Sequence, residues 1–211
     1  MKKVFAFAFA VLMFAGMANA QLGINVGYAP QTYTNTYTNG SISNTTNTEM
    51  TGIFAGVNYN MPLTGDLCVS LGAQYRMNSN SDEETLLGVT TETKKSQSLI
   101  DVPILFNYGL QFSDDLKLSV FLGPTVSYAL AGTTKTHTYA GTTTILDTEA
   151  NWYDDNSNRK ALDLSGTIGI SLKYHNIRLF GGYNMGLLNL TDADNTTLKG
   201  TNIFVGLGYC L

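Results

Sequence analysis

Eight segments of the chain alternate apolar with polar or small residues at a period of two, and this alternation constrains the fold most. A period of two is the signature of a β-strand, and the segments approach the length of about 9–11 residues that a tilted strand needs to cross a bilayer. None of their apolar positions is charged. These faces run from Leu22 to Tyr28, Ile53 to Tyr59, Leu67 to Tyr75, Ile100 to Tyr108, Leu116 to Tyr128, Leu164 to Tyr174, Ile177 to Tyr183 and Ile203 to Tyr209.

The lengths of the connections separate a membrane barrel from a soluble β-sandwich, which would show the same alternation. Three connections are short, at residues 62–66, 113–115 and 175–176. The other four are long and cover about residues 29–51, 78–98, 131–161 and 189–200. Short turns at one end and long loops at the other are typical of barrels in the outer membrane. The pattern therefore favours the barrel.

The tyrosines support the same interpretation, because each predicted strand ends its apolar face in one of them. Aromatic residues gather at both membrane interfaces, so two rows of tyrosines are expected to form two girdles. The rows are Tyr28, Tyr75, Tyr128 and Tyr183 at the outer side, and Tyr59, Tyr108, Tyr174 and Tyr209 at the inner side. We predict an all-β fold, an eight-stranded antiparallel transmembrane β-barrel in an up-and-down meander.

The first twenty residues have the order of a secretory signal peptide. Lys2 and Lys3 precede an apolar run over 4–17, and Ala18-Asn19-Ala20 forms a small-x-small cleavage site. The alternative is a retained membrane anchor, for which the run is short. We expect residues 1–20 to be removed and 21–211 to form the barrel domain. Without the two lysines the formal charge falls from −4 to −6, which argues against nucleic acid as a partner.

Two internal segments and the closing run resemble a known family. The segments are Ile100 to Tyr108 (IDVPILFNY) and Phe121 to Tyr128 (FLGPTVSY), and the closing run, Ile203 to Leu211, has apolar residues at every second place. They resemble the outer-membrane β-barrel domain family common in Bacteroidota, which includes PorT-like proteins and small barrels of the OmpA and OmpX type. The resemblance implies an outer-membrane location and recognition of the C-terminal strand by the barrel-insertion machinery. Family members usually end in Phe, where this chain has Leu211.

The residues that alternate with the apolar faces should point inward, and they predict which side chains fill the lumen. Eight strands leave an interior that side chains just fill. We expect a polar network of Arg76, Asp101, Asp163, Lys117, Lys173 and Arg178, with the last three cations at the inner mouth, and an aromatic plug of Phe54, Phe121, Phe180 and Phe204. A gate or selectivity ring is the functional interpretation of the charges, and a buried ion-pair network is the simpler one.

Residues for chemistry are scarce. Trp152, Tyr153, Asp154 and Asp155 combine exposed aromatics with paired acids and could contact a sugar or Ca²⁺, although the spacing is not that of an EF-hand. The two histidines, His137 and His175, have no cluster of ligands at metal spacing, and His137 has no evident catalytic partner. We predict no catalytic residue, cofactor or metal site. Cys68 and Cys210 are expected to be free thiols, because two strands separate them around the wall.

These features predict a non-enzymatic barrel with a filled lumen that presents its loops at the cell surface. A narrow channel or a PorT-like accessory of protein export is one alternative, and a lipid- or glycan-binding barrel is another. The expected partners are outer-membrane lipid, the insertion machinery and an unidentified surface or secretion partner. We expect a monomer.

Overall fold

The computed structural model describes residues 21–113, 115–140, 143–154 and 157–211, so the predicted signal peptide lies outside the described residues. Ten strands make up the regular structure of these ranges. They are β1 (Gln21–Tyr28), β2 (Gln31–Asn39), β3 (Ile42–Thr64), β4 (Leu67–Leu86), β5 (Val89–Gln111), β6 (Leu116–Ala140), β7 (Thr143–Asn151), β8 (Leu162–Tyr174), β9 (Ile177–Gly186) and β10 (Thr196–Cys210). No helix in the described ranges is long and apolar enough to cross a membrane.

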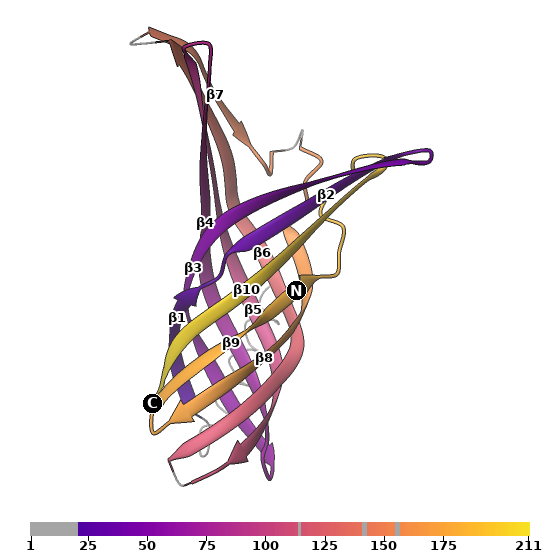
Figure 1. Ribbon diagram of the computed structural model, residues 1–211. Coiled ribbons are helices and arrows are strands. Elements are labelled where there is room, and N and C mark those ends of the chain that lie inside the picture. The colour runs from indigo at the N-terminus through magenta and orange to yellow at the C-terminus, as the bar shows by residue number, and fades with distance from the viewer. Residues whose placement is uncertain (1–20, 114, 141–142, 155–156) are drawn as a thin grey trace, which may run out of the picture.

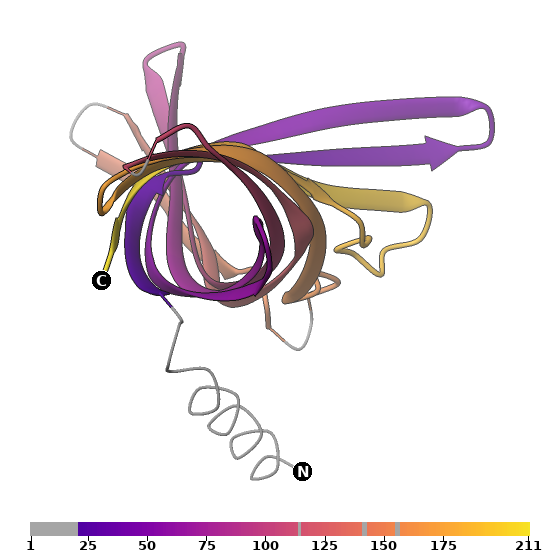
Figure 2. The ribbon, with the colours of Figure 1, turned by 90° about the horizontal axis from the view of Figure 1, so that it is seen from below.

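Antiparallel pairing closes the sheet into a ring, which confirms the predicted fold class (Figures 1 and 2). Around the wall the order is β1, β3, β4, β5, β6, β8, β9 and β10, and β10 pairs again with β1. Strand β2 continues the line of β1, since both pair with β3 and β10. Pro30 separates them because it has no backbone N–H to give to the ladder.

The segments predicted as long loops are mostly strand, so that prediction is wrong in detail. Residues 31–39, 42–50 and 196–202 form a first arm from β2, β3 and β10. A second arm contains β7 and the upper parts of β4, β5 and β6, from residues 80–86, 89–97 and 133–140. The two arms diverge above the barrel in Figure 1. Thr- and Asn-rich sequences lack the apolar alternation used to find strands, yet backbone pairing continues through them.

The arms separate between β3 and β4. The last pair in that ladder joins Thr51 to Ser79. Just above it, the Asn80 amide donates to the Glu49 carbonyl at 2.9 Å between nitrogen and oxygen, and the Thr51 hydroxyl donates to the Ser79 carbonyl at 2.9 Å. These side chains satisfy carbonyls that lose their strand partner where the arms part.

Apolar side chains cover the outside of the wall at alternate positions. Leu122, Ile168 and Ile203 are about 60% exposed, as are other aliphatic residues at the same parity. The eight girdle tyrosines have this outward parity, and seven are exposed while Tyr59 is half-buried. Such a surface needs lipid around it. The inward positions of the wall are mostly buried, and many of them are polar or small.

The three short turns fall where the sequence places them. Gly65 lies between β3 and β4 with a φ of 54°, a left-handed conformation that suits glycine. His175 has a φ of 50° between β8 and β9, where the neighbouring Asn176 amide donates to the Cys210 carbonyl at 2.7 Å. All three turns lie at the end opposite the arms, which makes this the inner, periplasmic end.

Candidate functional site: the barrel lumen and its two mouths

Four phenylalanines from four strands fill the middle of the lumen. The ring centroids of Phe54 and Phe180 are 6.1 Å apart, Phe180 and Phe204 are 6.3 Å apart, and Phe204 and Phe121 are 6.2 Å apart. The four rings therefore form one chain of contacts, at distances typical of aromatic pairs. Phe54, Phe121 and Phe180 are buried and Phe204 packs against them.

Each ring of the plug lies against a glycine on a neighbouring strand. A Cβ atom at Gly27, Gly169, Gly182 or Gly206 would lie 2.3–2.6 Å from a carbon of Phe54, Phe121, Phe204 or Phe180 respectively. No real Cβ contact is that short, so the glycines provide the space for the rings. The inward glycines are a sequence signal for the plug that alternation alone does not reveal.

Above the plug, Arg76 and Asp101 form a buried ion pair. Arg76 Nε donates to Asp101 Oδ2 at 2.8 Å and Arg76 Nη2 donates to Oδ1 at 3.2 Å, so the guanidinium contacts both carboxylate oxygens. Arg76 Nη1 also donates to Gln31 Oε1, which accepts a longer bond from Asn202 at 3.4 Å. Arg76 and Asp101 are only 4% and 5% exposed, so each compensates a charge that water reaches poorly.

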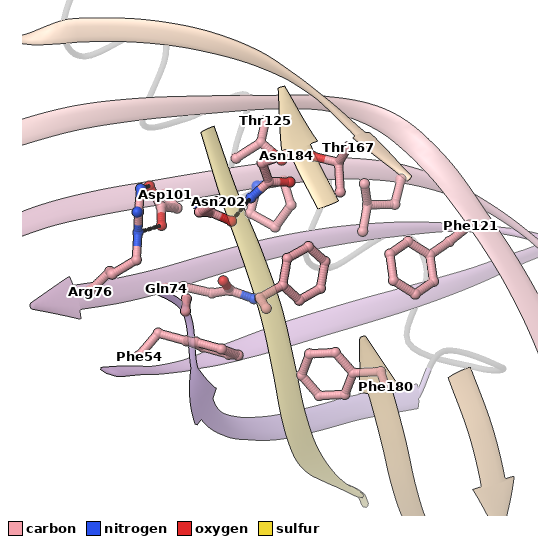
Figure 3. A pocket seen from close by; sticks show the side chains of 14 residues that line it. Phe54, Gln74, Arg76, Asp101, Phe121, Thr125, Thr167, Phe180, Asn184 and Asn202 are labelled. Carbon is pink, nitrogen blue, oxygen red and sulfur yellow. Dashed lines mark hydrogen bonds and ion pairs between the residues drawn. The ribbon is translucent and has the colours of Figure 1, made fainter. Parts of the chain in front are cut away.

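A small cavity of about 50 Å³ lies between the ion pair and the plug. Figure 3 shows Arg76 and Asp101 at the left with Phe54 below them, and the rings of Phe121 and Phe180 at the right. Thr125 and Thr167 complete its wall, with 2.7 Å between their hydroxyl oxygens. A cavity of this size holds only a few water molecules. The rings and the ion pair together interrupt the lumen.

Below the plug, a ladder of amides crosses four strands. Asn25 donates to Asn58 at 2.7 Å, and Asn58 donates to Asn60 at 3.0 Å. Ser70 donates to Asn60 and accepts from Asn107 at 3.0 Å. Each of these side chains points into the lumen, and their mutual bonds satisfy polar groups that water reaches poorly.

The predicted polar network is two separate groups divided by the plug. Lys117, Lys173 and Arg178 lie at the inner mouth, where they line a second cavity of about 280 Å³. Asp163 lies at the outer side, where its Cα pairs with that of Ser127 on β6. In the described part of the chain Asp163 makes no ion pair, and its Oδ1 is buried without a hydrogen-bond partner. Asp163 therefore does not join Arg76 and Asp101 directly.

At the outer mouth, the residues predicted to contact a loop ligand fold inward. Trp152 Nε1 donates to the Thr134 hydroxyl at 2.7 Å, and the Tyr153 hydroxyl accepts from Gln97 Nε2 at 2.6 Å. Both rings are half-buried, which corrects the expectation that they are exposed. Asp154 is exposed, and Asp155 lies outside the described residues.

Arg159 lies among the aromatic rings of Trp152, Tyr153 and Tyr33, and we call this group of residues over the outer mouth the outer cap. Its guanidinium carbon lies 4.2 Å from the Trp152 ring centroid, 4.4 Å from that of Tyr33 and 5.9 Å from that of Tyr153. Stacking of a guanidinium on aromatic faces is favourable, and more so when the group is shielded from water. Burial raises the pKa of Tyr33 and of Tyr153, so both phenols stay protonated at physiological pH.

Sequence reasoning missed most of the outer cap. Beneath Arg159 lies an apolar cluster of Tyr33, Met50 and Leu190, all buried. Tyr33 also donates to Gln97 at 2.7 Å. These residues belong to segments classed as long loops, which are expected to be polar and variable. Apolar residues inside such segments, together with the chain's single Trp, were the signal available.

His137 has an acid partner that the sequence did not indicate. Its Nδ1 lies 3.1 Å from Asp147 Oδ1 on β7, high on the second arm, and His175 Nδ1 lies 2.9 Å from Asp115 Oδ1 at the inner rim. Within the described ranges, no three His, Cys, Asp or Glu side chains gather as a metal site. Cys68 and Cys210 are both free, as expected.

The comparison with protein families agrees with this architecture. A family model described as "Outer membrane protein beta-barrel domain" matches residues 14–192. Among curated proteins, none matches the sequence. Among solved structures, the chain is similar to Ail, the attachment invasion locus protein of Yersinia pestis, with a TM-score of 0.43 and 14% identity over 92% of this chain and 99% of that one. The chain is also similar to Neisserial surface protein A, with a TM-score of 0.44 and 11% identity over 90% of this chain and 98% of that one. A third similar structure is that of the outer membrane enzyme PagL, with a TM-score of 0.39 and 14% identity over 83% of this chain and 97% of that one.

Proposed function

Because the chain belongs to the outer-membrane β-barrel domain family, we propose that it is a non-enzymatic anchor that holds two β-sheet arms above the membrane for contact with a surface partner. The barrel itself lies in the cell outer membrane. One observation carries the proposal: the lumen is filled by a plug, while the strands of the wall continue outward as paired arms. From Tyr75 to Leu86 alone, β4 extends by about 35 Å at about 3.3 Å per residue.

The arms offer backbone edges to which a partner strand can be added. Residues 42–50 of β3 pair only with β2, and β7 pairs only with β6, so each has one edge without a partner in the described structure. Unpaired edges bind extended peptides through main-chain hydrogen bonds. On the open edge of β4 stand Asp82, Glu83 and Glu84, whose charges discourage pairing between identical copies. A partner with basic side chains suits this edge.

Cross-linking in living cells tests the role of the arms. A photoreactive residue replaces Thr38 at the tip of the first arm or Leu87 at the tip of the second. We expect defined adducts with a surface macromolecule from these positions. The same residue at Ile168, on the lipid face of the wall, is the matched control and should give no such adduct. Equal patterns at all three positions would contradict the proposal.

Shortening an arm supplies the second test. Thr34 and Asn47 are paired, so replacing residues 34–47 by Asn-Gly leaves a two-residue hairpin turn between Tyr33 and Thr48. The shortened protein should fold into the membrane as the natural chain does, give no surface adduct from a photoreactive residue at Thr48 beside the new turn, and keep the adduct from Leu87. Steady conductance of well-defined size from the natural barrel in a planar bilayer would instead support the channel alternative.

The narrower resemblance to PorT-like proteins of Bacteroidota stays a prediction, as does the accessory role in protein export that it implies. Adducts with secretion components, rather than with external molecules, would favour that role. The lipid- or glycan-binding alternative also stays a prediction; of the residues predicted for a loop contact, Trp152 and Tyr153 take part in hydrogen bonds of the outer cap.

A further inference from the structure

Three cations stand side by side across three neighbouring strands at the inner mouth. Lys117 on β6 is paired directly with Lys173 on β8, and Lys173 is paired directly with Arg178 on β9. Directly opposed residues in an antiparallel sheet have Cα atoms about 5 Å apart. All three side chains line the cavity of about 280 Å³, which we call the inner vestibule. The row therefore concentrates three positive charges on one wall of a single cavity.

The row is not neutralised by acids in the described part of the chain. None of the three cations makes an ion pair there, and Asp115, the one described carboxylate that lines the vestibule, lies 2.9 Å from His175. Like charges directly opposite one another destabilise a sheet. The arrangement contrasts with the outer end of the lumen, where Arg76 is matched by Asp101. A purely structural role does not account for three adjacent cations.

Neighbouring side chains hold the cations apart and oriented. Arg178 Nη2 donates to Asn25 at 2.9 Å and to Asn58 at 3.2 Å, and its guanidinium carbon lies 4.9 Å from the Phe180 ring centroid. Lys173 Nζ donates to Gln21 Oε1 at 3.1 Å. Lys117 lies across Gly109, where a Cβ atom would come within 2.0 Å of its Cε. Arg178 is thus fixed against the plug, and the two lysines line the wall of the vestibule beside it.

The rest of the lining is suited to an anion. Asn60, Asn107 and Ser171 contribute amide and hydroxyl groups to the same cavity. Phosphate oxygens are strong acceptors for lysine and arginine, and several cations around one site favour an ion that carries more than one negative charge. The plug closes the vestibule on its outer side, so a ligand enters from the periplasm.

We propose that the inner vestibule is a binding site for a compact multivalent anion bearing phosphate groups, held by Lys117, Lys173 and Arg178. This site is separate from the arms and does not depend on the function proposed for them. Its ligand reaches the barrel from the periplasm, whereas a surface partner reaches the arms from outside.

Calorimetric titration of the barrel in zwitterionic detergent at low salt tests the site. Inorganic pyrophosphate is the probe, and orthophosphate is the comparison. We expect pyrophosphate to bind at least tenfold more tightly, because its two phosphoryl groups can contact more than one cation. Lys173→Gln should weaken pyrophosphate binding about tenfold or more. The affinity should also fall steeply as salt is added.

Lys199→Gln is the matched control, since it removes one exposed lysine from the first arm, at the end of the barrel opposite the inner vestibule. It should leave pyrophosphate binding unchanged. Without ligand, Lys173→Gln should unfold no more easily than the natural protein, because it relieves repulsion between like charges. Absence of binding, or equal loss in the two variants, would overturn the proposal.

Cys68 gives an independent measurement, because its side chain also lines the vestibule and is partly exposed. In a Cys210→Ser variant, a negatively charged methanethiosulfonate should modify Cys68 faster than a positively charged one of similar size. Pyrophosphate should slow the negative reagent severalfold. If both reagents react at equal rates and pyrophosphate has no effect, the vestibule does not attract anions and the proposal is wrong.

Discussion

Strand β5 runs from the second arm down through the barrel wall, and its two parts carry different side chains on the outward face. In the wall these are Ile100, Ile104 and Phe106, whereas in the arm they include Lys94 and Ser96. The antiparallel ladder with β6 continues through both parts with one irregularity, between Ser98 and Leu99. The backbone pairing is therefore common to wall and arm, while the solvent around each part determines its side chains.

The wall and the arms also differ in how their charged and polar side chains are satisfied. The wall encloses a lumen whose polar groups must be satisfied by one another, as Arg76 and Asp101 are. The arms enclose no lumen, and their ion pairs, such as Lys135 with Glu149, face water. Interactions of one chemical kind should therefore differ in energy between the two regions, and four predictions test that difference.

The largest effect is expected from removing one partner of the buried ion pair. Arg76→Met leaves the Asp101 carboxylate without its cation in the lumen and should cost about 3–5 kcal/mol of unfolding free energy. Urea unfolding of the barrel in lipid vesicles measures it. The double variant Arg76→Met with Asp101→Leu should recover most of the loss, since no unpaired charge remains. A loss below about 1 kcal/mol in the single variant would mean that water reaches the site freely.

Next in size is a charge placed on the outer face of the wall. Leu122 and Ile145 are 58% and 57% exposed, but Leu122 faces lipid in β6 and Ile145 faces water in β7. Leu122→Arg should cost about 2–4 kcal/mol because the charge enters the hydrocarbon. Ile145→Arg should change stability by no more than about 0.5 kcal/mol. If the two variants lost equal amounts of unfolding free energy in vesicles, the boundary assigned here between wall and arms would be wrong.

The outer cap joins the two regions, and its loss should have an intermediate, local effect. Arg159→Gln removes the guanidinium from Tyr33 and Trp152 and should weaken the cap by about 1–2 kcal/mol. Hydrogen exchange should then be faster in residues 31–37 and 132–137, with the wall unchanged. Lys160→Gln, beside it in sequence and partner of exposed Asp192, is the control and should have little effect. Faster exchange throughout the barrel would contradict a local role.

The wall was predictable from sequence because the membrane imposes a rule that a single chain displays. Lipid outside and a narrow lumen inside force strict alternation, so the parity of Leu122 and Phe121 could be assigned without coordinates. The inner turns followed from the same alternation. The pairing of Arg76 with Asp101 could be predicted because the two residues lie at a similar height on neighbouring strands.

The arms and the cap were not predictable in this way. Strand pairing in water tolerates Thr and Asn on both faces, so residues 42–50 show no period from which a strand could be recognised. Arg159 meets Tyr33 only because residues distant in sequence fold over the outer mouth, and no local pattern encodes that meeting. The separation of the lumen charges into two groups likewise depends on the exact height of the phenylalanine plug.

The smallest effect is expected for the ion pair on the second arm. Lys135 Nζ and Glu149 Oε2 are 3.2 Å apart, but the two side chains are 49% and 56% exposed. Water and salt screen such a pair, and holding two long side chains in place costs conformational entropy. Lys135→Ala should therefore change the unfolding free energy by less than about 0.5 kcal/mol, and Lys135→Ala with Glu149→Ala should show almost no coupling. The same double-variant analysis of Arg76 and Asp101 should give a coupling of several kcal/mol, because burial removes that screening. Two couplings of similar size would show that exposure to water does not separate the arms from the wall.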